Sequence, residues 1–195
     1  MKATPREARI YLFFGILLIA LPSILSLYQG QSGKFLVATG MLNGGYFEKT
    51  VIYVERHTLW GAHGIVINQP LRDNDYKPNM PLEKEEGGRL RLMRGGPVVA
   101  DKGSWLILRG DPPVLIPYNS LSPLEDIPEI SPDERLFYGY AGWAMLQLNR
   151  EITRGKWGVI DYDPALISGE IPSEEIWPIA IERVLQKAPA DIGGV

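Results

Sequence analysis

An uncharged run near the N-terminus constrains this chain more than any other feature of its sequence. Residues 10–27 form 18 consecutive positions without a charged side chain. A membrane-spanning helix needs about 17–25 apolar residues, whereas the apolar core of a cleaved signal peptide has only about 7–15. The residues that follow, Leu27-Tyr28-Gln29-Gly30, match a signal cleavage site poorly, because such a site requires small side chains. The sequence therefore predicts a retained N-terminal transmembrane helix.

Basic residues are concentrated on the N-terminal side of this run. Lys2, Arg6 and Arg9 precede it, and only Lys34 lies close behind it. Because basic residues flanking a membrane helix favour the cytoplasmic side, we expect an inner-membrane protein whose following domain lies on the periplasmic side. A cytoplasmic location is the alternative. In the membrane-anchored protein, residues 1–30 comprise the cytoplasmic tail, the anchor and a tether, and residues 31–195 form a single domain.

Composition excludes several classes of protein. Hydrophobic residues make up 45% of the chain and charged residues 22%, which excludes wholesale disorder. The chain has no cysteine, so it has no disulfide scaffold, thiolate zinc site or cysteine nucleophile. A net charge of -3 argues against a nucleic-acid partner. No cofactor is predicted.

Runs of apolar and β-branched residues predict strands, and two later segments predict helices. The expected helices are 143–153, with Met145, Leu148 and Ile152 on one face, and 173–187, with Pro178 in its first turn. Six prolines in residues 112–132 exclude a long helix there. Because strands dominate the middle of the chain and helices come late, the predicted class is α+β. The expected strands are 34–41, 50–54, 64–68, 90–93, 105–108, 136–138 and 157–162.

Aromatic residues and glycines provide candidate binding residues. Trp60 lies in a loop next to a glycine, and Trp143 precedes Gln147 by one helical turn. These side chains are candidates for lining a pocket or a partner surface, although Trp143 fits a core position better. Gly95 and Gly96 are candidates for binding an anion through their backbone N–H groups, with a tight turn as the alternative.

The two histidines of the chain, His57 and His63, are candidates for metal or acid–base chemistry. With Glu55 they would supply the three protein ligands of a catalytic zinc site, but the usual helical spacing is missing, so no metal site is predicted. His57 together with a distant acid or serine would make a hydrolase, although no serine lies in a G-x-S-x-G motif. Asn68 is a candidate either for binding a ligand or for capping a turn.

Five segments, taken in order, carry a resemblance to a known family. The segments are Phe35-Leu36-Val37-Ala38, Phe47 to Tyr53, Gly61 to Leu71, Gly95-Gly96-Pro97-Val98 and Gly139 to Trp143. They resemble the YqgE/AlgH family of bacterial proteins from about Lys34 to the C-terminus. The resemblance implies an α+β fold of mixed or antiparallel sheets, with a small, partly closed β-barrel surrounded by helices. It implies no reaction, because that family has no agreed biochemical activity.

This sequence also departs from the family pattern. The Cys-Glu-His triplet of the family reads Glu55-Arg56-His57 here, so only the histidine carries over. We therefore expect a non-enzymatic, membrane-tethered binding or regulatory protein. Its expected partners are the membrane, through the N-terminal helix, and an unknown protein or small molecule. The alternatives are a hydrolase that uses His57 and a cytoplasmic, transcription-linked regulator.

Overall fold

The computed structural model describes most of the domain and a few residues before it. Contacts between residues divide the chain into two compact units, Met1–Gly30 and Gln31–Val195. In the first unit, the described residues before Gly30 are helical. The described residues are 6, 9–12, 14–15, 30–71, 91–98, 105–118 and 135–187.

The transmembrane helix predicted over 10–27 is not found. Within the described part of the chain, no helix combines the length and the apolar character that crossing a bilayer requires. The helical residues described in that run are 10–12 and 14–15. The rest of the run lies outside the described residues. This part of the predicted fold class is corrected accordingly.

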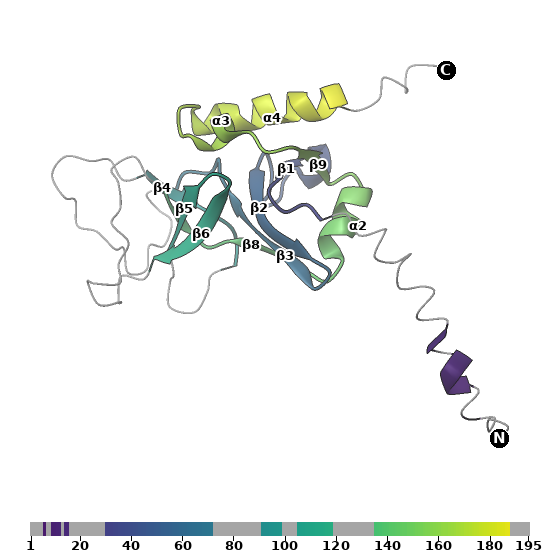
Figure 1. Ribbon diagram of the computed structural model, residues 1–195. Helices are drawn as coiled ribbons and strands as arrows, with labels where there is room; N and C mark the ends of the chain where they lie inside the picture. The colour runs from purple at the N-terminus through teal and green to yellow at the C-terminus, as the bar shows by residue number, and fades with distance from the viewer. Residues whose placement is uncertain are drawn as a thin grey trace, which may run out of the picture. The chain divides into compact units, whose positions relative to one another are not determined.

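A five-stranded antiparallel sheet forms the centre of the second unit (Figure 1). Its first two strands are continuous apolar runs at their starts, because side chains on both faces of the sheet are buried. A short 3-10 helix, η1 (Gly40–Leu42), follows the first strand. In spatial order the strands are β8 (Ala141–Ala144), β3 (Gly61–Val66), β2 (Val51–Thr58), β1 (Phe35–Ala38) and β9 (Trp157–Ile160).

Two helices cover opposite faces of this sheet. Side chains of α4 (Ser173–Lys187) pack with Phe35 and Val37, which lie on one face of β1. Side chains of α2 (Gln147–Thr153) pack with Leu36 and Ala38, which lie on the other face. A short helix, α3 (Pro164–Ile167), precedes α4 and is capped by the Asp163 carboxylate, which accepts the Ala165 N–H (2.9 Å).

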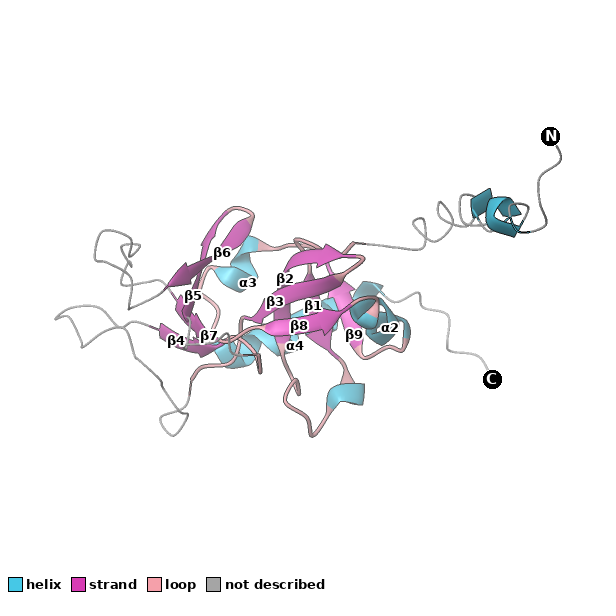
Figure 2. Ribbon diagram, turned by 90° about the horizontal axis from the view of Figure 1, so that it is seen from below, coloured by secondary structure: helices cyan, strands magenta, loops and turns pink. Residues whose placement is uncertain are grey.

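A second sheet of four strands lies beside the first (Figure 2). In it β4 and β7 are parallel, whereas β5 pairs antiparallel with both β6 and β7, so the sheet is mixed. The Tyr53 hydroxyl on β2 donates to the Pro113 carbonyl on β6 (2.9 Å) and ties the two sheets together. The strands, in spatial order, are β4 (Arg91–Arg94), β7 (Arg135–Tyr138), β5 (Trp105–Gly110) and β6 (Pro113–Tyr118).

The α+β class with mixed and antiparallel sheets agrees with the structure, but the partly closed β-barrel does not. A barrel closes when its outermost strands pair with each other. In the described residues the first sheet ends at β8 and β9 and the second at β4 and β6, so both are open. The sheets are joined only locally, for example by the isolated bridge between Pro70 and Met93. The structure therefore has two sheets in place of a barrel.

Each of the two predicted helices differs from the structure in one respect. The helix expected over 143–153 begins only at Gln147, because Trp143 and its neighbours belong to β8 and pair with β3. Pro178 lies inside α4 and not in its first turn. The helix tolerates it because Pro178 and Glu174, whose carbonyl loses its intrahelical N–H partner, are both exposed to solvent. Of the proline-containing segment 112–132, the described part is β6 and the residue before it.

Candidate functional site

An apolar surface lies at one end of the five-stranded sheet. Trp60, in the turn between β2 and β3, is 82% exposed, more than any other large hydrophobic side chain among the described residues. Gly61 pairs with Ala144 at the end of β8 and brings this turn beside Met145 and Leu146, which are 55% and 42% exposed. The β2–β3 turn and the start of α2 lie close together in Figure 1. Trp60, Met145 and Leu146 are referred to below as the tip surface.

Backbone geometry holds this surface in place. A Cβ atom at Gly61 would lie 2.4 Å from the Trp143 carbonyl oxygen, so only glycine allows the two segments to approach so closely. Leu146 has φ 58°, a left-handed conformation that is uncommon for a residue other than glycine. Its carbonyl accepts the Arg150 N–H (3.1 Å), which starts α2 directly behind the tip. Such strain costs on the order of 1–3 kcal/mol and is most often found at functional sites.

A carboxylate behind the tip surface binds three side chains. Glu151 on α2 accepts hydrogen bonds from the indole N–H of Trp143 (3.0 Å) and of Trp157 (2.8 Å) through Oε2. Its Oε1 accepts the Gln147 amide (3.1 Å), and Gln147 Oε1 in turn accepts the Ala144 N–H (3.0 Å). We refer to Glu151 with Trp143, Gln147 and Trp157 as the Glu151 clasp. The clasp fastens α2 to β8 and β9, the strands at the two edges of the sheet.

The clasp also controls the charge of Glu151. Burial on its own would raise the pKa of this carboxyl group. The hydrogen bonds from Trp157, Gln147 and Trp143, together with the positive charge of Lys156, outweigh burial and hold the pKa below its ordinary value. Glu151 is therefore an anion at neutral pH, and its two oxygens are already engaged by the fold.

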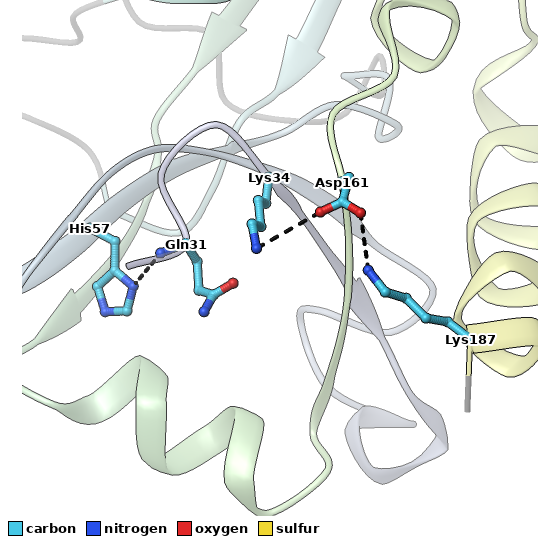
Figure 3. A network of polar contacts seen from close by, with 5 residues as sticks. All are labelled: Gln31, Lys34, His57, Asp161 and Lys187. Atoms are coloured by element: carbon cyan, nitrogen blue, oxygen red, sulfur yellow. Dashed lines mark hydrogen bonds and ion pairs between the residues drawn. The ribbon is translucent and has the colours of Figure 1, made fainter. Parts of the chain in front are cut away.

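His57 is buried at the same end of the sheet, where it binds the start of the domain. The ring atom Nδ1 of His57 accepts the backbone N–H of Gln31 (3.1 Å), and the backbone N–H of His57 donates to Ser32 Oγ (2.7 Å). Figure 3 shows the imidazole directed at the Gln31 backbone, and it also shows Lys34 and Lys187 on either side of Asp161. His57 thus fixes the point at which the chain enters the domain.

Three of the other candidate residues lie at the opposite end of β3. Asn68 is buried, where its Oδ1 accepts the Val51 N–H (2.8 Å) and its Nδ2 donates to the Lys49 carbonyl (2.9 Å). The Gly95 N–H donates to the Tyr138 carbonyl (2.8 Å), so it is not directed at a ligand. Gly96 lies against the backbone of Tyr140, with no room for a side chain. The structure therefore brings His57, Trp60, Trp143 and Gln147 to one end and Asn68, Gly95 and Gly96 to the other.

Two polar arrangements were not anticipated as pairs from the sequence. His63 Nδ1 lies 3.0 Å from Glu55 Oε2, and the imidazole contacts the Tyr140 ring at a tilt of 42°, with centroids 4.3 Å apart. Arg135 is half-buried and donates to the carbonyls of Ile67 and Ile167. Burial, aided by the charge of the neighbouring Arg91, lowers the pKa of Arg135 to about 10. Glu55 and His63 are eight residues apart, and only the pairing of β2 with β3 shows that their side chains meet.

No cluster of three or more His, Cys, Asp or Glu side chains with metal-binding geometry is found among the described residues. His57 and His63 do not converge, because His57 is buried under α2 whereas the His63 side chain pairs with Glu55. The three-ligand site considered from the sequence is thus not assembled by these residues.

Comparison with known proteins places the domain in a family. The family model described as AlgH-like (DUF179) matches residues 35–188, which include every strand and helix described in the second unit. The chain belongs to the AlgH-like family. Relatives named UPF0301 protein include one from Vibrio cholerae, 31% identical over 173 residues (78% of this chain and 91% of the relative). Another, from Coxiella burnetii, is 33% identical over 185 residues (88% of this chain and 90% of the relative).

Solved structures agree with this fold for an AlgH-like domain. The solution structure of the AlgH protein from Pseudomonas aeruginosa superimposes with a TM-score of 0.52 at 21% identity, and covers 86% of this chain and 97% of that one. The crystal structure of a Corynebacterium diphtheriae protein, DIP2367, superimposes with a TM-score of 0.54 at 22% identity. The match covers 80% of this chain and 88% of that one. At these identities the similarity supports the fold alone.

The position of His57 makes the stability of this AlgH-like domain dependent on pH. Burial lowers the pKa of His57, and the neighbouring Asn149 side chain offsets part of that change. Because the unfolded chain then binds a proton at higher pH than the folded domain, stability should fall as the pH decreases through about 6.5. Urea unfolding of the wild-type protein between pH 5.5 and 7.5 should show this slope, and His57→Gln should flatten it. Above that range the difference in the free energy of unfolding between the wild-type protein and His57→Gln should no longer change with pH. An unchanged slope in His57→Gln would contradict the assignment of the pH dependence to His57.

Proposed function

We propose that this AlgH-like protein is a binding protein that acts through its tip surface, and not an enzyme. The observation that carries the proposal is the exposure of Trp60 to 82%, beside Met145 and Leu146, at one end of the sheet. Large apolar side chains gathered on an exposed surface are typical of interaction sites. The left-handed Leu146 adds local strain that the fold accepts in order to keep an apolar side chain at the surface.

The polar candidates support the same interpretation, because the fold itself uses them. A general base must reach the proton that it removes, but His57 is buried and its Nδ1 accepts the Gln31 N–H. Asn68 satisfies two backbone groups, and Gln147 holds Glu151. These side chains have a structural use that requires no substrate.

The Glu55–His63 pair is the feature closest to catalytic geometry. A carboxylate that orients a histidine is one half of a hydrolase triad, and the other half is a hydroxyl or thiol nucleophile bonded to the histidine. In the part of the chain that the structure describes, Glu55 is the hydrogen-bond partner of His63 and no hydroxyl group bonds to its ring. The Glu55–His63 pair lacks the nucleophile of a triad, so it supports catalysis only weakly. The tip surface is the stronger evidence for a binding function.

Site-specific photocrosslinking tests whether the tip surface makes contacts in cells. Trp60 is replaced in the full chain by a benzophenone-bearing phenylalanine analogue, which is also large and aromatic, and native cells are irradiated. We expect discrete adducts at position 60. The matched control carries the same analogue at Val114, which is 53% exposed on β6 of the second sheet. Equal adduct yields at the two positions, or none at either, would contradict a binding role for the tip.

A further inference from the structure

We propose that His63 is a phosphoryl-accepting residue, whose Nε2 takes the phosphoryl group of a phosphoramidate while Glu55 positions the ring and Arg56 binds the phosphoryl oxygens. The site uses none of the tip residues, so the inference goes beyond the proposed function and does not depend on it. Accepting one phosphoryl group requires a single nucleophile and no triad. It is therefore compatible with a protein that is not an enzyme.

An irregularity in the pairing of β2 with β3 brings an acid and a base to one histidine. The register shifts between Val54 and Arg56, which leaves Glu55 as an extra residue on β2. In such a bulge, two residues of one strand lie opposite one residue of the other. Arg56 is the register partner of His63, and the Glu55 carboxylate contacts the His63 ring. Bulges often redirect side chains next to functional sites.

The Glu55 carboxylate decides which nitrogen of His63 is the nucleophile. Because Glu55 Oε2 accepts from His63 Nδ1 (3.0 Å), Nδ1 carries the proton and, in the neutral ring, Nε2 carries the lone pair. Among the described residues, Nε2 has no hydrogen-bond partner. In that part of the chain Asn149 Oδ1 is the one buried side-chain polar atom without a partner, so the unbonded Nε2 is reached by solvent.

The neighbours of His63 on the two adjacent strands provide space on one side and a positive charge on the other. On β8 the register partner of His63 is Gly142, which is exposed and has no side chain. On β2 the partner is Arg56, also exposed, whose guanidinium makes no hydrogen bond or ion pair with the described residues. A guanidinium binds phosphate oxygens through two parallel hydrogen bonds. Arg56 is therefore placed to hold a phosphoryl group that arrives at Nε2.

The other histidine of the chain has the opposite arrangement and provides an internal comparison. The Nδ1 atom of His57 is the acceptor for the backbone N–H of Gln31, so the lone pair of its neutral ring is already used. His57 is also buried, which leaves no space for a phosphoryl donor to approach. The two histidines thus differ in both properties that a phosphoryl acceptor needs, a free lone pair and access to it.

The transfer balances with phosphoramidate as the only other reactant. The Nε2 lone pair of His63 attacks phosphorus and forms a P–N bond, while the P–N bond of the donor breaks. The donor nitrogen, which is already protonated, leaves as ammonia with the bonding electron pair. The ring becomes an imidazolium that keeps its Nδ1 proton, and the Glu55 carboxylate balances the new positive charge. Because one P–N bond replaces another, this class of donor can supply the group without a large uphill step.

Treatment of the full chain with phosphoramidate at neutral pH tests the assignment. Phosphorus NMR distinguishes Nε2-phosphohistidine from its Nδ1 isomer, and mass spectrometry in alkaline solution, where phosphohistidine survives, locates the modified residue. We expect a single phosphoryl group on His63 Nε2, formed faster than on N-acetylhistidine in the same solution. His63→Asn should abolish the modification, whereas His57→Gln should retain it.

Two further variants separate the assigned roles from simple exposure of the ring. Glu55→Gln should lower the rate about tenfold and let the Nδ1 isomer form, because a neutral amide neither fixes the proton on Nδ1 nor balances the imidazolium. Arg56→Gln should lower the rate about tenfold while the product stays on Nε2. The matched control is Arg154→Gln, which removes an exposed arginine at the end of α2 and should leave the rate unchanged.

Several results would overturn the inference. They are an unmodified folded chain, modification of His57, an Nδ1 product in the wild-type protein, and a rate no higher than that of N-acetylhistidine. A wild-type rate in Glu55→Gln or in Arg56→Gln would overturn it as well, because the site would then be only an exposed imidazole. None of these results affects the proposed binding function, which crosslinking at position 60 tests separately.

Discussion

Glu151→Ala should destabilise the domain by about 3 kcal/mol, because a partly buried ionised acceptor leaves three donors without a partner. The donors are the indole N–H groups of Trp143 and Trp157 and the amide of Gln147. For a domain of this size, 1 kcal/mol corresponds to a shift of about 2–4 °C in the melting temperature. Thermal and urea unfolding of the full chain measure the change.

The same carboxylate should give the domain a characteristic loss of stability in acid. The folded pKa of Glu151 lies below its ordinary value, so the ionised group contributes stability at every pH above the unfolded pKa. That contribution is lost as the pH falls through about 4.5 toward the folded pKa. Glu151→Gln should lose stability at neutral pH and should depend less on pH than the wild-type protein in this range.

An exposed glutamate provides the control for the Glu151 variants. Glu182 on α4 is exposed and accepts a hydrogen bond from Gln186 (3.1 Å). Glu182→Ala removes the same side chain outside the clasp and should change the free energy of unfolding by less than about 0.5 kcal/mol. If Glu151→Ala were as mild as Glu182→Ala, the clasp would have no role in holding α2 against the sheet.

Gly96→Ala should be at least as damaging, at about 3 kcal/mol or more, because the added methyl group meets backbone that cannot move aside. Its Cβ would lie 2.0 Å from the carbonyl carbon of Tyr140 and 2.4 Å from the Ala141 nitrogen. This crossing joins the segment after β4 to the segment that leads into β8. Urea unfolding measures the effect, and expression only in insoluble form would be consistent with it.

A graded series of glycine variants keeps this prediction specific. At Gly142 the nearest contact is the flexible Tyr140 ring, 3.3 Å from the added Cβ, so Gly142→Ala should have an intermediate effect. At Gly40 the nearest atom is Asn43 Nδ2 at 3.8 Å, so Gly40→Ala should be nearly neutral. A reversed order among the three variants would show that backbone proximity does not limit the fold at Gly96.

The elements that sequence reasoning predicted well are those whose pattern is local. The apolar runs at 35–38 and 51–54 mark strands whose side chains are buried on both faces. Ile176, Ala180 and Val184 recur at helical spacing, and they pack against the sheet as part of α4. In these segments the neighbouring residues alone carry the periodicity of the element.

The errors occurred where long-range pairing decides the structure. The spacing of Met145, Leu148 and Ile152 predicted a helix from Trp143 onward, yet Trp143 pairs with β3, a contact that no local pattern contains. The barrel came from the family resemblance and not from any residue of this chain. Of the three hydrogen bonds of Glu151, only that from Gln147, four residues earlier, follows a helical spacing. The proximity of Trp60 to Met145 likewise depends on the pairing of Gly61 with Ala144.

The strand order of the five-stranded sheet has a consequence for how the chain is made. β8 and β9, which border the sheet, are synthesised long after β1, β2 and β3, and Phe35 pairs with a residue more than a hundred positions later, Ile160. A growing chain can form the β2–β3 hairpin early, because that contact is local. Until residues 141–160 have left the ribosome, the three early strands have bare backbone edges on both sides, which are templates for pairing with other chains. The sheet is therefore completed only after its first three strands have been exposed, and this nascent three-stranded sheet is the species that chaperones would need to protect.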